Sequence, residues 1–84
     1  MNGFKIYADT PIVTIGENGK VTIDLSQLGA KVGYVSANLL GSDLIVVTQA
    51  SFNNNILTCY LRRVDTGAYA SQGTAYLAYM LFYK

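Results

Sequence analysis

The sequence predicts a small all-β protein, an antiparallel β-sandwich of about seven strands. Turn-forming residues recur about every eight to twelve positions, a spacing typical of sandwiches and barrels. Several segments alternate apolar and polar side chains, as strands with one buried face do. No segment shows the period of a long helix. The chain has 84 residues and no linker, so residues 1–84 form one predicted domain.

The first three predicted strands are short. Residues 4–8 and 11–15 are separated by a break at Asp9-Thr10-Pro11, and Pro11 is tolerated as the first residue of the second strand. Asn18-Gly19 then predicts a hairpin into residues 20–25, because both residues accept a positive φ. Residues 26–32 are predicted to be a loop that holds at most one helical turn.

The remaining predicted strands cover residues 34–40, 43–49, 56–63 and 74–83. Gly41-Ser42 predicts a tight turn between the first two of these. Residues 50–55 and 64–73 are predicted to be polar loops. In the strand at 56–63, one face carries Leu57, Cys59 and Leu61.

The last strand is apolar on both faces. One face carries Ala75, Leu77, Tyr79, Leu81 and Tyr83, and the other carries Thr74, Tyr76, Ala78, Met80 and Phe82. A strand with one solvated face alternates with polar residues. We therefore expect the first, bulkier set to face the core, and Tyr76, Ala78, Met80 and Phe82 to form an interface between subunits. The alternative is a central strand buried in a monomer.

The composition also favours an oligomer. Half of the residues are apolar and 13% are charged, against roughly 25% charged residues in an average soluble domain. A chain this short buries only about 60–65% of its surface on folding, so it needs support from a disulfide, a metal or a partner subunit. Cys59 is the only cysteine and there is no histidine, which leaves oligomerisation. The alternative is a monomer with a surface rich in Ser, Thr and Asn.

Catalytic chemistry is not expected. Without histidine the commonest general base is missing, and Cys59 lies in an apolar strand where a thiol fills the core. The five acidic residues lie mostly in or beside turns. We predict no catalytic residues, no metal site and no cofactor. The net charge of +1 argues against nucleic-acid binding, and the longest apolar run is too short to cross a membrane as a helix.

Two polar loops are the candidate ligand-binding residues. Short polar side chains with an aromatic platform suit carbohydrate binding. The candidates are Asn53, Asn54, Asn55, Asp65 and Tyr69. Ordinary loop composition explains the same residues equally simply.

The order of these segments resembles a known family. Residues 20–84 resemble the small β-sandwich domains that end bacteriophage tail fibres and are related in shape to the H-type lectins. The likeness is carried by the strand Val21-Thr22-Ile23-Asp24-Leu25, by Tyr34-Val35-Ser36-Ala37, and by the closing run Gly73-Thr74-Ala75-Tyr76-Leu77-Ala78-Tyr79-Met80. Tyr76 stands where that family usually has tryptophan.

The resemblance implies a homotrimer packed around a threefold axis, with loops at one end that contact a cell-surface glycan or another virion protein. The expected protein is therefore a non-enzymatic fibre-tip or head-decoration module of a phage virion, made in the host cytoplasm without a signal peptide. The alternative is a purely structural cement or adaptor protein that binds no ligand.

Overall fold

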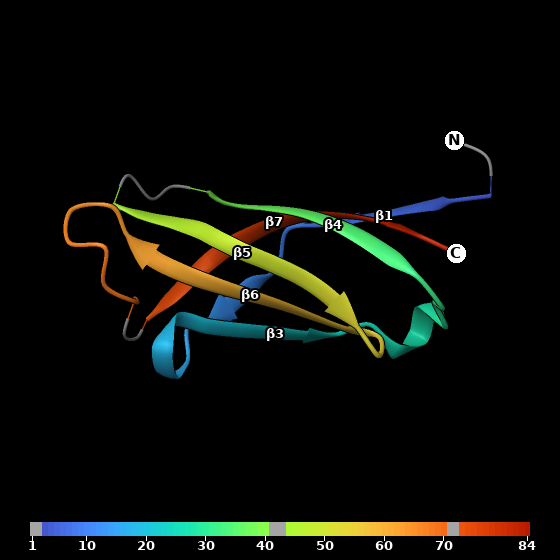
Figure 1. Cartoon of the computed structure of the whole chain (residues 1–84), viewed down its shortest axis with the longest axis horizontal. Helices are drawn as coiled ribbons and strands as arrows, with labels where there is room; N and C mark the ends of the chain where they lie inside the picture. The colour runs from blue at the N-terminus through green and yellow to red at the C-terminus, as the bar shows by residue number, and fades with distance from the viewer. Residues whose placement is uncertain (1–2, 41–43, 71–72) are drawn as a thin grey trace.

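A computed structural model describes residues 3–40, 44–70 and 73–84, and within them every paired strand belongs to one of two antiparallel sheets (Figure 1). Sheet A contains β1 (Lys5–Asp9), β2 (Ile12–Thr14), β4 (Gly33–Leu40) and β7 (Thr74–Tyr83). Sheet B contains β3 (Lys20–Asp24), β5 (Ile45–Asn53) and β6 (Ile56–Arg63). The prediction of an all-β chain with about seven strands is confirmed.

The two strands with the most buried residues, three each, lie at the centres of their sheets. β7 pairs with β4 along one edge, and with β1 and then β2 along the other. β6 lies between β3 and β5. A central strand has a neighbour along each edge, so its backbone hydrogen bonds are satisfied within the sheet.

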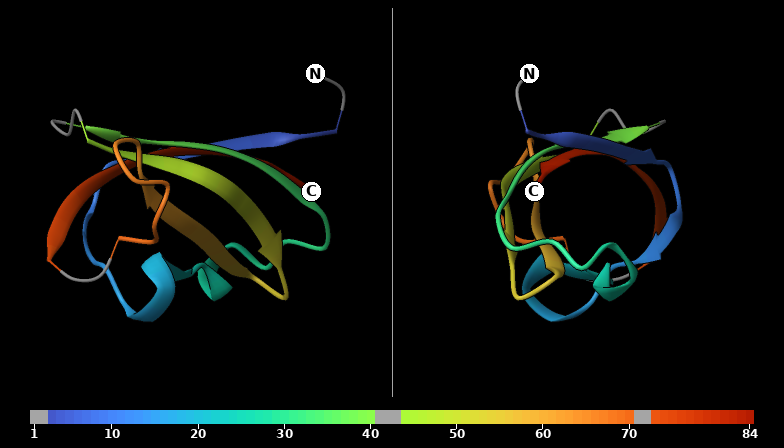
Figure 2. Two further views of the ribbon diagram at one scale, coloured as in Figure 1. Left: turned by 60° about the vertical axis from the view of Figure 1, so that its left-hand side comes forward. Right: turned by 90° about the vertical axis from the view of Figure 1, so that its right-hand side faces the viewer.

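The two sheets curve around one core, and the molecule measures 41 × 21 × 19 Å (Figure 2). Leu77, Tyr79 and Leu81 of β7 are buried, which confirms that this face of the last strand meets the core. Cys59 is also buried, as predicted. The full buried set is Val13, Ile15, Val21, Leu25, Leu57, Cys59, Leu61, Ala70, Leu77, Tyr79 and Leu81.

The hairpin predicted at Asn18-Gly19 is wrong. Both residues do have positive φ, at 59° and 70°, within the 3₁₀ turn η1 (Glu17–Gly19). However, β2 pairs with β7 while β3 pairs with β6, so this turn connects the two sheets. A Cβ at position 19 would lie 2.3 Å from the carbonyl oxygen of Leu61, so only glycine fits.

The predicted polar loop at 50–55 is also wrong in extent. β5 continues to Asn53, and the turn is reduced to Asn54 and Asn55, with φ of 52° and 64°. A register irregularity between Val47 and Gln49 shifts the alternation, which the sequence pattern did not anticipate. Beyond it, Phe52 packs against the core.

Two smaller predictions concern the connections. The helical turn expected within 26–32 is present as η2 (Ser26–Leu28). The turn predicted at Gly41-Ser42 lies outside the described residues. Residue 43 lies outside them too, and the fifth strand begins at Ile45.

Candidate functional site

The outer face of sheet A carries four rows of side chains that cross β7. Two bulky rows lie at its ends: Ile6, Phe82 and Tyr34 form one, and Ile12, Tyr76 and Leu40 form the other. Between them lie Ala8, Met80 and Ser36 in one row, and Ala78 with Asn38 in the next. All four residues predicted to form an interface, Tyr76, Ala78, Met80 and Phe82, point to this face. Whether they contact another subunit stays a prediction.

This face is more apolar than a solvated surface should be. Ile6, Ile12, Tyr34, Leu40, Tyr76 and Met80 are exposed by between 42% and 64%. A large side chain offers on the order of 200 Å² when fully exposed, so together they present about 650 Å² of largely apolar surface. The largest apolar patch of a typical monomer is about 300–600 Å², and one partner of a stable complex buries about 800 Å². The two bulky rows lie about 20 Å apart, so this area is divided between two patches, and only their sum approaches the area that one partner of a complex buries.

A groove crosses the middle of this face between the two bulky rows. Its volume is about 570 Å³. Six small or polar residues line it, Ala8, Asp9, Thr10, Ser36, Asn38 and Ala78, together with the larger Tyr79 and Met80. The groove exists because Ala8 and Ala78 stand where the bulky rows carry isoleucine, phenylalanine and tyrosine.

The outer face of sheet B differs in composition. Its cross-strand neighbours are mostly polar, with Thr22 and Ser51 on either side of Thr58, and Lys20 and Gln49 on either side of Tyr60. Val46 is an exposed apolar side chain beside Arg62. This composition is that of an ordinary solvated sheet face.

The predicted ligand-binding residues divide between the two ends of β6. Asn53, Asn54 and Asn55 lie at the β5–β6 turn, where residues 30–34 and 52–55 line a cleft of about 380 Å³. The Asn55 side-chain oxygen accepts a hydrogen bond from the Ala30 amide at 3.0 Å, and its carbonyl accepts one from the Leu25 amide at 2.8 Å. Asn55 therefore holds the wall of the cleft, while the exposed Asn53 and Asn54 remain candidates.

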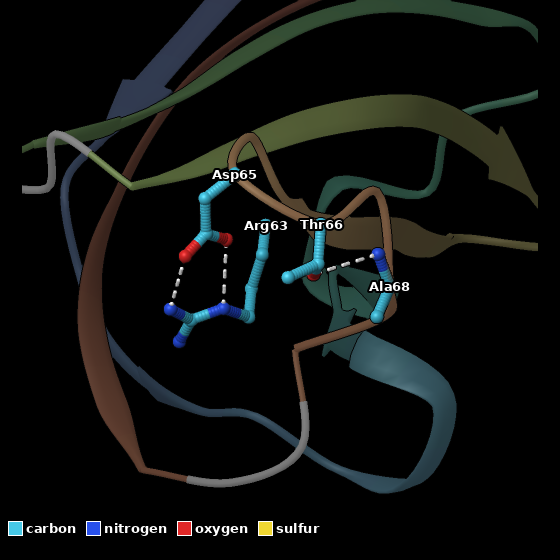
Figure 3. A network of polar contacts seen from close by, with 4 residues as sticks. All are labelled: Arg63, Asp65, Thr66 and Ala68. Atoms are coloured by element: carbon cyan, nitrogen blue, oxygen red, sulfur yellow. Dashed lines mark hydrogen bonds and ion pairs between the residues drawn. The ribbon is translucent and has the colours of Figure 1, made fainter.

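Asp65 and Tyr69 lie beyond the other end of β6, in the segment that leads toward β7 (Figure 1). Arg63 donates two hydrogen bonds to the Asp65 carboxylate at 3.0 and 2.7 Å, and the Ala68 amide donates to the Thr66 hydroxyl at 3.2 Å (Figure 3). The Arg63 guanidinium lowers the pKa of Asp65. These contacts fix the loop.

Tyr69 is held by the neighbouring Arg62. The Arg62 guanidinium carbon lies 3.9 Å from the centre of the Tyr69 ring, and its Nη1 donates to the carbonyl of Gly67 at 2.8 Å. A cation over an aromatic ring is attractive and occupies one face of the ring. The five predicted ligand residues therefore do not form one site, because β6, about 25 Å long, separates the asparagines from Asp65 and Tyr69.

Two titratable side chains of the core, Cys59 and Tyr79, have raised pKa values. Burial raises the pKa of the Cys59 thiol to about 11. Burial, with a further contribution from Tyr7 and Asp9, raises the pKa of Tyr79 to about 12. A thiol with such a pKa is protonated at neutral pH and is a poor nucleophile.

Two features are absent from residues 3–40, 44–70 and 73–84. No three His, Cys, Asp or Glu side chains lie together there in a way that could hold a metal ion. No helix in the same part of the chain is long and apolar enough to span a membrane.

No protein-family model matches the chain, and no detectable similarity links it to a curated protein or to a solved structure. The resemblance to phage tail-fibre domains is thus supported only by the sequence pattern.

Sequence reasoning identified the strand at the centre of the apolar face but missed its flanks. Ile6, Ile12, Tyr34 and Leu40 join the face only because β1, β2 and β4 all pair with β7. The alternation in residues 34–40 could have indicated two of these four. Val35, Ala37 and Leu39 are all apolar and are the less exposed set, which leaves Tyr34 and Leu40 on the outer face.

Proposed function

We propose that this protein is a non-enzymatic structural module of a bacteriophage particle, and that its copies assemble through the outer face of sheet A. The observation that carries the assembly is the apolar surface of about 650 Å² formed by the two bulky rows and Met80. Apolar side chains exposed on this scale favour a partner that covers them. The partner is a second copy of the chain, because a small domain without disulfide or metal gains stability by self-association.

The phage setting is supported by the resemblance of residues 20–84 to tail-fibre tip domains. On that resemblance the assembly is a homotrimer in the virion, formed after synthesis in the host cytoplasm. Its remaining surface binds a host-surface glycan or another virion protein. The cleft beside Asn53 and Asn54 is the candidate place for a glycan.

A ligand-free cement or adaptor protein is the second candidate. It is favoured by the separation of Asn53–Asn55 from Asp65 and Tyr69, since a single glycan site does not use both ends of β6. Binding to a glycan array separates the candidates: a signal that is lost with Asn54→Ala supports the receptor function, and an array without signal supports the cement.

Light scattering on the purified protein tests the assembly. We expect the mass of an oligomer, a trimer by preference, at micromolar concentration. Met80→Asp places a charge in the middle of the apolar face, so it should weaken association at least tenfold while the monomer stays folded. Thr58→Asp is the matched control, because it places the same charge in the middle of the polar face. A wild-type chain that is monomeric throughout the concentration range would contradict the proposal.

A further inference from the structure

The outer face of sheet A is not flat, because a groove lies between its two bulky rows. Its bulky rows are centred on Phe82 and Tyr76, six residues apart along β7, so about 20 Å separates them. The groove of about 570 Å³ lies between them. Measured along β7, each bulky row is about one side chain wide. The groove is two rows wide in the same direction: one row is Ala8, Met80 and Ser36, and the other is Ala78 and Asn38.

Two ways of stacking a second copy on this face can be compared. If the bulky rows of both copies meet each other, the two grooves also meet and leave a large void, which close-packed interfaces do not tolerate. If the copies are offset along the strands by about 10 Å, a bulky row of one copy enters the groove of the other. Only the second arrangement packs a bulky row of each copy against protein without a void, and it leaves the other bulky row of each copy outside the contact.

The polar groups in the groove point to the same occupant. Ser36, Asn38, Thr10 and the Asp9 carboxylate lose contact with water once the groove is covered, and each then needs hydrogen-bond partners. Each bulky row contains a tyrosine, Tyr34 or Tyr76, whose ring is apolar and whose hydroxyl donates and accepts hydrogen bonds. A row that enters the groove therefore brings both the apolar surface and the polar partner.

We propose that the groove on the outer face of sheet A is a socket that receives a bulky row of a second copy of this chain. The inference rests on the proposed assembly through this face and adds how two copies fit together. Because the contact uses the same face on both copies, it predicts a dimer, and a trimer held by this face would overturn the socket. The socket sets the offset between subunits, so it decides which arrangement the apolar surface permits.

Filling the groove tests the socket. Ala78→Trp and Ser36→Trp each place a large side chain where the incoming row would lie, without adding charge. Both should raise the dissociation constant of the oligomer roughly tenfold or more, because overpacked contacts are costly. Thr58→Trp, in the middle of the polar face of sheet B, is the matched control and should leave association unchanged. Analytical ultracentrifugation measures association, and circular dichroism confirms the fold.

Fluorescence adds a second readout. The chain contains no tryptophan, so each variant carries a single reporter. In the dissociated variants the emission of Trp at position 78 or 36 should match that of an exposed indole. If tryptophan prevents folding at either position, Ser36→Leu makes the same comparison with a smaller side chain.

The outcomes separate the two proposals. An oligomeric wild type whose association is unchanged or tightened by the filling variants overturns the socket and leaves assembly through this face intact. A monomeric wild type overturns both. Weakened association in the filling variants but not in Thr58→Trp supports the socket.

Discussion

The outer faces of the two sheets differ, although their inner faces are alike. Both inner faces are apolar and contribute to one core, with Leu77, Tyr79 and Leu81 from sheet A and Leu57, Cys59 and Leu61 from sheet B. Outside, the central rows of sheet B are Thr22, Thr58 and Ser51, and Lys20, Tyr60 and Gln49, whereas sheet A carries two bulky apolar rows. Folding explains the inner faces, but it does not explain why one outer face is apolar.

The largest expected effect is on the inner faces, where the two sheets should respond alike. Tyr79→Asp in sheet A and Leu61→Asp in sheet B each place a carboxylate in the core, and each should lower the free energy of unfolding by about 3 kcal/mol or more. Asp65→Ala removes an exposed loop contact and should leave the unfolding midpoint nearly unchanged. Urea denaturation measures all three. Equal effects for Tyr79→Asp and Asp65→Ala would contradict the position of β7.

Alkaline pH should lower the free energy of unfolding through one core residue in each sheet. The pKa of Cys59 is raised from 9.0 to about 11, and that of Tyr79 from 10.0 to about 12. Between these values the unfolded chain has lost each proton and the folded chain still holds it, so stability falls as the pH rises. The stability is fully present below about pH 9 and declines through pH 11 to 12. Thermal unfolding at successive pH values measures this, and Cys59→Ala should remove the part of the decline that begins near pH 9.

The smallest expected effect sharpens the difference between the outer faces. Association through an apolar face depends little on ionic strength, so raising sodium chloride about tenfold should change the dissociation constant of the oligomer by less than about twofold. Sodium sulfate should tighten association, because excluded salts strengthen apolar burial. Sedimentation at each salt concentration measures it. A marked weakening in sodium chloride would indicate that charged groups, rather than the bulky rows, hold the subunits together.

The positions of the strands could be predicted from the sequence better than their pairing. The bounds of β6 and β7 were predicted to the residue, because their alternation and flanking turns are clear. The partner of β2 was predicted wrongly. Asn18-Gly19 is a hairpin signal that favours pairing with the next strand, whereas the true partner, β7, lies about 60 residues further along the chain. Phe52 was assigned to a loop because its neighbours are polar and Asn53, Asn54 and Asn55 follow it. The irregularity between Val47 and Gln49 hid its place in the alternation of β5.

The same limits apply to the candidate site. Tyr76 and Met80 were identified from one strand, whereas Ile6 and Leu40 become their neighbours only through pairings that span much of the chain. The ligand prediction grouped Asn54 with Tyr69 by composition, and composition carries no information about which end of a strand a loop occupies.

The position of β7 at the centre of sheet A has a consequence for folding. The pairings within sheet B join residues at most 40 positions apart, as between Lys20 and Tyr60. The pairings of β1 and β2 with β7 join residues 60 or more positions apart, as between Thr14 and Thr74. Closing a longer loop costs more entropy, so we expect sheet B to pair before β1 and β2 join β7. Until they join it, Ile6 and Ile12 stay exposed on unpaired strands, where they can contact other unfolded chains.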